Sequence, residues 1–93
     1  MLATGCTRSS NVNQASSPLE HGKAVFGQNC AQCHGPDGTQ GGVGPSLRDE
    51  RARKNYSATV AWIKAPLPPM PKLYPSTLSE KDVEDVAAYV QSL

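Results

Sequence analysis

Aromatic residues are scarce in this chain of 93 residues. They make up only 5% of the sequence, and all hydrophobic residues together make up 38%. A chain of this length buries a modest apolar core and often needs an additional staple to be stable. The composition therefore predicts one small domain whose centre is completed by something other than its own side chains.

The chain also lacks a large net charge, a long hydrophobic run and a recognisable catalytic constellation. Its formal net charge of +1 implies neither nucleic acid nor an anionic membrane surface as a partner. No stretch is long and apolar enough to span a membrane. There is no nucleophile–base pair, no pocket-like pair of carboxylates and no phosphate-binding loop, so we do not expect an enzyme.

Cysteine is rare as well, yet two of the three cysteines fall in one short motif. Cys30, Cys33 and His34 spell C-x-x-C-H, the pattern of covalent haem c attachment. Two thiols three positions apart can add across the two vinyl groups of one haem, and the adjacent histidine then reaches the iron. The motif predicts one haem c bound through Cys30 and Cys33, with His34 as an iron ligand.

Other uses of the two thiols remain open on the motif alone. A structural zinc site needs four ligands, which here would be Cys30, Cys33, His34 and His21 at an unusual spacing. A thioredoxin-like dithiol belongs to a strand–helix unit, and no run of β-branched residues precedes Cys30. The haem interpretation is favoured over both.

Capping signals predict a helix near each end of the folded part. Ser17 and Glu20 form a capping box around a proline, which predicts a helix over residues 18–29. Ser79 and Asp82 form a second box, and the acidic residues that follow suit the dipole of a last helix.

These two helices are expected to pack against each other. Gly22 and Phe26 are four residues apart and share one face of the first helix. The last helix carries an apolar stripe of Val83, Val86, Tyr89 and Val90. Gly22 leaves room for a close approach of the last helix, and Phe26 offers a ring to pack.

Glycine and proline divide the middle of the chain. Residues 35–44 hold five glycines and predict a loop. A short helix is expected over residues 57–64, and Pro66 ends it. Residues 66–71 hold four prolines and cannot form a helix or a central strand.

Together these features resemble the class I c-type cytochromes. In that family a G-P-x-L segment follows C-x-x-C-H, and its proline carbonyl accepts the N–H of the haem-binding histidine; Pro45 in G-P-S-L matches it. The family also carries a methionine ligand in an irregular loop, often as M-P. Met70 matches it, and apart from Met1 it is the only methionine.

The resemblance covers residues 18–93 and implies an all-α fold. This is the small cytochrome c fold, with first and last helices packed together and one or two short helices and long loops around a covalent haem. Trp62, Tyr56 and Arg51 are further candidates for haem contacts, through hydrogen bonds to the propionates. His21 is a rival to Met70 as the second iron ligand.

The resemblance implies an electron-transfer protein rather than an enzyme. Iron held by His34 and Met70 has no open position for a substrate, so we expect a monomeric one-electron carrier that docks transiently with respiratory or other redox partners. A gas-binding or sensing haem module with a displaceable Met70 is the alternative. A detached domain of a larger oxidase or dehydrogenase is a third possibility.

Residues 1–17 are expected to form a separate tether. They are rich in Ser and Asn, and residues 3–6, A-T-G-C, resemble the end of a bacterial lipoprotein signal. Ala3 stands where leucine is usual, and residues 1–2 are too short for a complete signal. Lipidated Cys6 would place the protein in the periplasm or on the outer face of the bacterial cytoplasmic membrane.

The charges are unevenly distributed along the chain. Residues 48–72 carry six cations against two anions, and the last fourteen residues carry four anions against one cation. Solvated faces would explain this pattern. A dipole that orients an acidic docking partner would explain it too.

Overall fold

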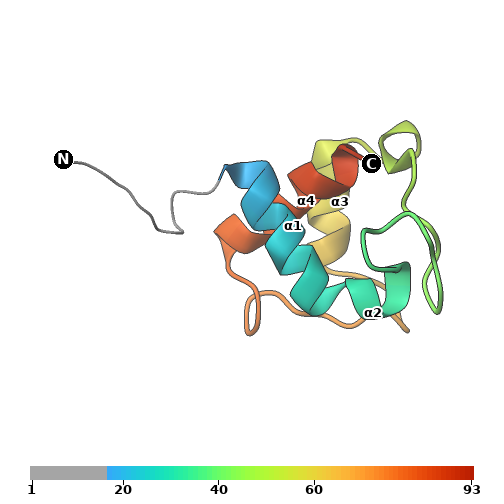
Figure 1. Ribbon diagram of the computed structural model, residues 1–93. Helices are drawn as coiled ribbons and strands as arrows, with labels where there is room; N and C mark the ends of the chain where they lie inside the picture. Colours follow the sequence, from blue (N-terminus) through green and yellow to red (C-terminus); the bar gives the residue numbers. More distant parts are fainter. Residues whose placement is uncertain (1–16) are drawn as a thin grey trace.

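The computed structural model describes residues 17–93, and within that range the fold is helical with no strand (Figure 1). The elements are α1 (Pro18–Asn29), α2 (Ala31–His34), the 3₁₀ turn η1 (Glu50–Ala52), α3 (Tyr56–Lys64) and α4 (Glu80–Gln91). Helix α1 packs along α4, and α3 packs on α4 from another side. The expected all-α fold with packed first and last helices is therefore confirmed.

The caps at both ends of the fold are those expected from the sequence. Ser17 and Glu20 bond reciprocally at the start of α1, and Ser79 and Asp82 do the same at the start of α4. Each box satisfies two backbone N–H groups that a helix start leaves without partners.

Three local features differ from the sequence prediction. Helix α3 begins at Tyr56 rather than at residue 57, because the Asn55 side chain accepts a hydrogen bond from the Ala58 backbone and caps the helix. The attachment motif itself ends in the short helix α2, and η1 interrupts the loop before α3. Neither α2 nor η1 has a periodic apolar pattern from which the sequence could predict it.

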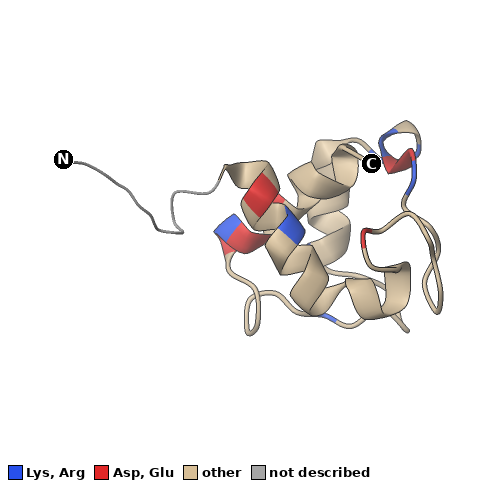
Figure 2. Cartoon of the chain, in the orientation of Figure 1, with Lys and Arg blue, Asp and Glu red and all other residues tan. Residues whose placement is uncertain are grey.

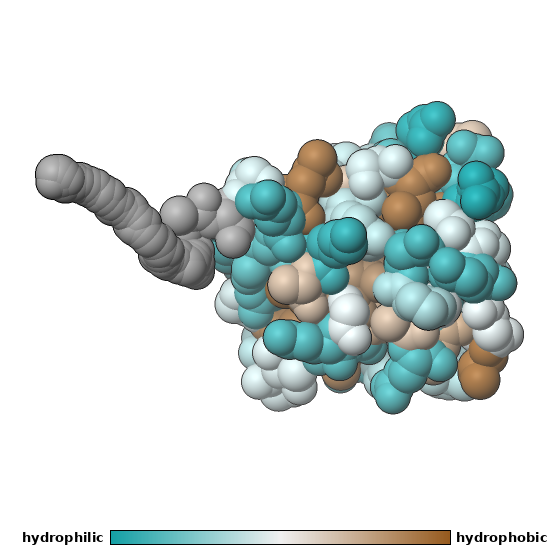
Figure 3. Space-filling model, viewed as in Figure 1, coloured by the Kyte–Doolittle hydropathy of each residue, from teal (hydrophilic) through white to brown (hydrophobic). Residues whose placement is uncertain are grey.

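One buried cluster holds the helices together. Its fully buried large side chains are Phe26, Val83 and Val86, and the rings of Phe26 and Tyr89 lie 5.3 Å apart between centroids. Figure 3 shows a mainly hydrophilic outer face with scattered hydrophobic groups. No helix among residues 17–93 is long and apolar enough to cross a bilayer.

Candidate haem site

A cavity of about 490 Å³ opens between the end of α1, helix α3 and the proline-rich segment. Cavities that hold cofactors typically measure about 300–1,000 Å³ and are largely apolar. The apolar side chains on this wall come from all parts of the fold and include Phe26, Leu47, Ile63, Leu67, Leu73 and Val90. Such a wall excludes water from whatever fills it.

Six of the predicted site residues line this cavity. They are the expected attachment and ligand residues Cys30, Cys33, His34 and Met70, together with Pro45, the expected acceptor for His34, and Trp62, an expected propionate contact. They come from four separate stretches of chain, so only the tertiary fold brings them together. Cys30 and Cys33 are not joined to each other by a disulfide.

His34 is held in one orientation by its neighbours. Its Nδ1 lies 2.7 Å from the Pro45 carbonyl oxygen. A carbonyl oxygen only accepts, so Nδ1 donates the hydrogen bond, and in the neutral imidazole Nε2 then keeps a lone pair for a metal. Gly44 flanks the ring so closely that a β-carbon there would lie 2.7 Å from Cε1. The hydrogen bond expected between His34 and Pro45 is present.

The two thiols sit at the junction of α1 and α2. Burial raises the pKa of Cys30 to about 11, and the neighbouring Cys33 contributes to the rise. Within residues 17–93, no cluster of three or more His, Cys, Asp or Glu side chains could hold a metal ion. The zinc alternative thus has no support in the structure.

Met70 lies in the irregular segment that follows α3. The indole Nε1 of Trp62 donates a hydrogen bond to the Met70 sulfur over 3.2 Å. Prolines on both sides of Met70 restrict the backbone of this segment. Met70 therefore lines the cavity from a segment that is not itself helical.

A protein-family model described as "Cytochrome C oxidase, cbb3-type, subunit III" matches residues 17–90. The chain is 38% identical over 81 residues to cytochrome c6 of Cyanidium caldarium, which covers 83% of this chain and 72% of that protein. This chain belongs to the class I monohaem c-type cytochromes.

Two further relatives agree with this assignment. Cytochrome c6 of Synechocystis sp. is 37% identical over 78 residues, covering 77% of this chain and 62% of the relative. A cytochrome c-553-like protein of Synechocystis sp. is 32% identical over 75 residues, covering 80% and 68% of the two chains. No solved structure gives a significant match.

Family membership settles the cofactor and the broad function. Class I c-type cytochromes carry one covalently bound haem c and transfer electrons, so the predicted cofactor and the electron-transfer function are confirmed. The cytochrome is an electron-transfer protein, and the gas-sensing alternative is not favoured. The apolar cavity, the oriented imidazole and the two thiols on its wall fit such a haem.

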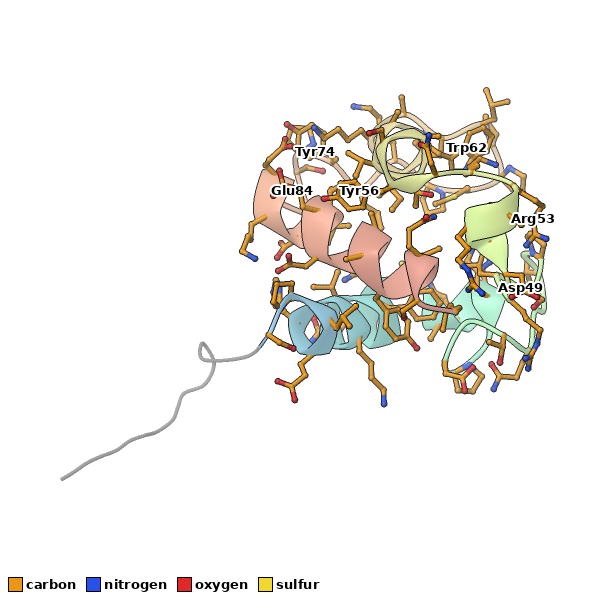
Figure 4. All side chains as sticks on the ribbon, turned by 90° about the horizontal axis from the view of Figure 1, so that it is seen from above. Asp49, Arg53, Tyr56, Trp62, Tyr74 and Glu84 are labelled. Atoms are coloured by element: carbon orange, nitrogen blue, oxygen red, sulfur yellow. The ribbon has the colours of Figure 1, made fainter. Side chains whose placement is uncertain are left out.

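Two of the predicted propionate contacts do not line the cavity of this cytochrome. The Tyr56 hydroxyl donates to the Glu84 carbonyl over 3.4 Å, and Figure 4 shows the two side by side. Arg51 lies 3.6 Å from Asp49 in an exposed ion pair. The structure therefore gives no support to a haem contact for Tyr56 or Arg51, because both turn toward other partners.

His21, the rival ligand, is also engaged elsewhere. Its Nδ1 donates to Asp85 over 2.6 Å, and its Nε2 lies 3.3 Å from Asp82. Both carboxylates belong to α4, and His21 is not on the cavity wall. Ligation by His21 has no support here, since both ring nitrogens are already occupied.

Sequence reasoning missed two charged residues on the cavity wall. Glu50 is buried, with 9% of its surface exposed, and it pairs with Arg53 at 2.7 Å and with Lys54 at 3.6 Å. Lys54 also lies over the Trp62 ring, 4.8 Å from its centroid. Both Glu50 and Lys54 line the cavity. No periodic pattern marks them, because they sit in and after a 3₁₀ turn.

Proposed function

We propose that this cytochrome carries single electrons between redox proteins, and that His34 and Met70 are the residues that would hold the iron of its haem. One observation carries the proposal. The attachment motif and Met70 line the same cavity, and the hydrogen bond from His34 Nδ1 to the Pro45 carbonyl selects the neutral tautomer whose Nε2 has a free lone pair. An imidazole and a thioether are the ligand pair that favours a high reduction potential in c-type cytochromes.

The chain's own residues prepare the site for electron transfer. When bound, the haem supplies a one-electron ferric/ferrous couple. His34 is oriented by Pro45, and the Met70 sulfur is oriented by Trp62. Apolar side chains exclude water, so little has to rearrange when the charge of the site changes.

The rim of the cavity provides a surface for docking. Val43 and Leu67 line the cavity and expose 82% and 65% of their surface. Exposed apolar groups at the mouth suit a small, short-lived interface, which is the kind that redox partners use. We propose that the monomer docks through this rim.

Several cations of residues 48–72 are paired within the chain and contribute less to steering than the sequence indicates. Arg53 and Lys54 pair with Glu50, and Lys64 pairs with Glu80. Figure 2 shows Lys and Arg positions around the η1 turn, together with acidic ones. Steering of an acidic partner is proposed for the remaining net charge, chiefly that of Arg48 and Lys72.

The proposed location is the outer side of a bacterial cytoplasmic membrane. Residues 1–17 would tether the domain of residues 18–93, with a lipid on Cys6, and Cys6 lies outside the described residues. A tether of about eleven residues would reach roughly 20 Å by a random-coil estimate, which would keep the carrier near membrane-bound partners. Fractionation of cells tests this: Cys6→Ser should move the cytochrome from the membrane to the soluble fraction, and an unmodified Cys6 in native membranes would end the proposal.

Spectroscopy of the holoprotein tests the ligand assignment. We expect a near-infrared sulfur–iron band in the oxidised state and no rapid binding of carbon monoxide in the reduced state. Met70→Ala should abolish the band and admit carbon monoxide. A wild-type protein that lacks the band and binds the gas quickly would favour the sensing alternative instead.

A further inference from the structure

Trp62 makes two contacts that connect the ligand loop to a charged group. Its Nε1 donates to the Met70 sulfur at 3.2 Å, and the Lys54 ammonium lies 4.8 Å above its ring. Trp62 is half-buried on α3, whereas Met70 has no helix of its own. The indole therefore reaches from a rigid element to a sulfur in an irregular segment.

Lys54 is itself held in place from two sides. Its ammonium lies 3.6 Å from the buried carboxylate of Glu50. Its backbone carbonyl accepts a hydrogen bond from the Gln91 side chain over 2.8 Å, which ties it to α4. Contacts with Glu50 of η1 and Gln91 of α4 thus hold the positive charge of Lys54 above the Trp62 ring.

We propose that Trp62 is a positioning residue that fixes the Met70 sulfur and weakens it as an electron donor, and that Lys54 strengthens this effect through the indole ring. The proposal rests on the proposed role of Met70 as a haem ligand. A thioether sulfur accepts hydrogen bonds weakly, and it has two lone pairs, so one can receive the indole N–H while the other serves a metal.

The expected consequence is a higher reduction potential. A hydrogen bond withdraws electron density from the sulfur, which makes it a weaker donor to the iron. Weaker donation destabilises the electron-poor ferric state more than the ferrous state, and the reduction potential therefore rises. A cation over an indole face is attracted to its π electrons and polarises the ring, which makes the N–H a stronger donor. Lys54 and Trp62 therefore act in the same direction.

Trp62→Phe tests the first part, because phenylalanine keeps an apolar ring and loses the N–H. We expect a lower midpoint potential of the holoprotein, with the near-infrared sulfur–iron band retained. Trp62→His returns a ring N–H and should recover part of the shift. An unchanged potential in Trp62→Phe would overturn the proposal, and so would equal shifts in both variants, since bulk alone would then explain them.

Loss of the band in Trp62→Phe is informative too. If Trp62→His keeps the band, the donor is needed to hold the sulfur, which supports the positioning role. If both variants lose it, the role belongs to the bulk of the indole and the proposal fails. The near-infrared band of the wild-type protein tests Met70 ligation separately. If the wild type lacked the band, Met70 ligation itself would be refuted, whatever the Trp62 variants show.

Lys54→Met tests the second part and keeps the length of the side chain. It should lower the potential in the wild-type background and lower it less in the Trp62→Phe background, where no indole transmits the charge. Equal shifts in the two backgrounds would overturn the role of Lys54. Lys64→Met is the matched control, because Lys64 lies over Tyr74, 5.0 Å from its ring centroid, and is not on the cavity wall; its shift should be smaller than that of Lys54→Met.

Discussion

Gly22 of α1 lies directly against the backbone of Asp85 in α4. A β-carbon at Gly22 would overlap the Asp85 carbonyl oxygen and stand 3.0 Å from the Tyr89 β-carbon. The two helices therefore approach as closely as their backbones allow. This approach places Phe26 against Tyr89 and brings the end of α1, which the attachment motif follows, to the edge of the cavity.

Gly22→Ala should destabilise the fold by about 1–3 kcal/mol, the usual cost of overpacking a tight contact. Gly27 is the matched control, because it lies in the same helix and a β-carbon there would meet nothing within 4 Å. Gly27→Ala should stabilise the protein by about 0.4–1 kcal/mol through the unfolded state. Denaturant titration of both variants measures this, and equal effects would show that the two helices do not meet at Gly22.

Gly44→Ala should disturb the imidazole of His34. The new methyl group would lie 2.7 Å from Cε1 and 2.9 Å from Nδ1, so either the ring or the loop must move. We expect a weakened sulfur–iron or imidazole–iron bond, seen as a changed optical spectrum and faster binding of carbon monoxide. Gly27→Ala, at a position off the cavity wall where a β-carbon would meet nothing within 4 Å, should leave the spectrum as it is. An unaltered spectrum in Gly44→Ala would contradict the tight cradle around His34.

Asp85 should make stability depend on pH in the acid range. Burial pushes the pKa of Asp85 up, and hydrogen bonds and charges from Lys81 and His21 outweigh it, so the pKa lies below its ordinary value. A depressed pKa in the folded state contributes stability above the unfolded pKa of about 3.9, and that contribution is lost as the pH falls through the folded pKa.

Denaturant midpoints of Asp85→Asn and of the wild type, compared from about pH 2 to 7, test this role of Asp85. The range spans the ordinary carboxyl pKa of about 3.9. The variant should be less stable than the wild type at neutral pH, and the gap should close as the pH falls below the pKa of the unfolded carboxyl group. Asp49→Asn is the exposed control and should show no such convergence. A gap that stays constant down to the acid limit would refute the role of Asp85.

Tyr89→Phe should destabilise the protein by about 0.5–1.5 kcal/mol, the net value of one hydrogen bond. The Tyr89 hydroxyl donates to the Asp37 carbonyl over 2.6 Å and the residue is buried, so the loss leaves the carbonyl without its partner. Tyr56→Phe removes a longer bond of 3.4 Å at an exposed site and should be close to neutral. Thermal or denaturant unfolding of the pair distinguishes the two positions.

Ionic strength should affect the reaction with anionic redox agents. If Arg48 and Lys72 steer acidic partners, oxidation by ferricyanide should slow several-fold as salt rises, because screening shortens the reach of exposed charges. Lys72→Glu should reduce the rate at low salt, while a cationic cobalt complex should show the opposite trend. Rates that are flat in salt for both reagents would remove the steering hypothesis.

Local signals explain most of what could be predicted. The capping boxes at Ser17 and Ser79 act within one helical turn, so neighbouring residues alone reveal them. The C-x-x-C-H motif and Met70 in its proline segment can also be identified as candidates from the sequence alone, since attachment and ligation require particular residue types. Helix α3 begins one residue earlier than its apolar pattern predicts, because the cap at Asn55 lies outside that pattern.

The sequence by itself determined the cofactor and the helical class, and it predicted the residues that would serve the haem, because each depends on residue type and short spacing. Only the tertiary structure decided which partners the remaining polar groups take: His21 with Asp85, Trp62 with Met70, and Glu50 inside the cavity. His21 and Asp85 are 64 residues apart in the chain, and Glu50 lies in a 3₁₀ turn without a period. Trp62 and Met70 are only eight residues apart, but they meet because the irregular segment after α3 folds back on that helix. Their geometry follows from how closely α1 and α4 approach and how the loops close around the cavity, which no local pattern encodes.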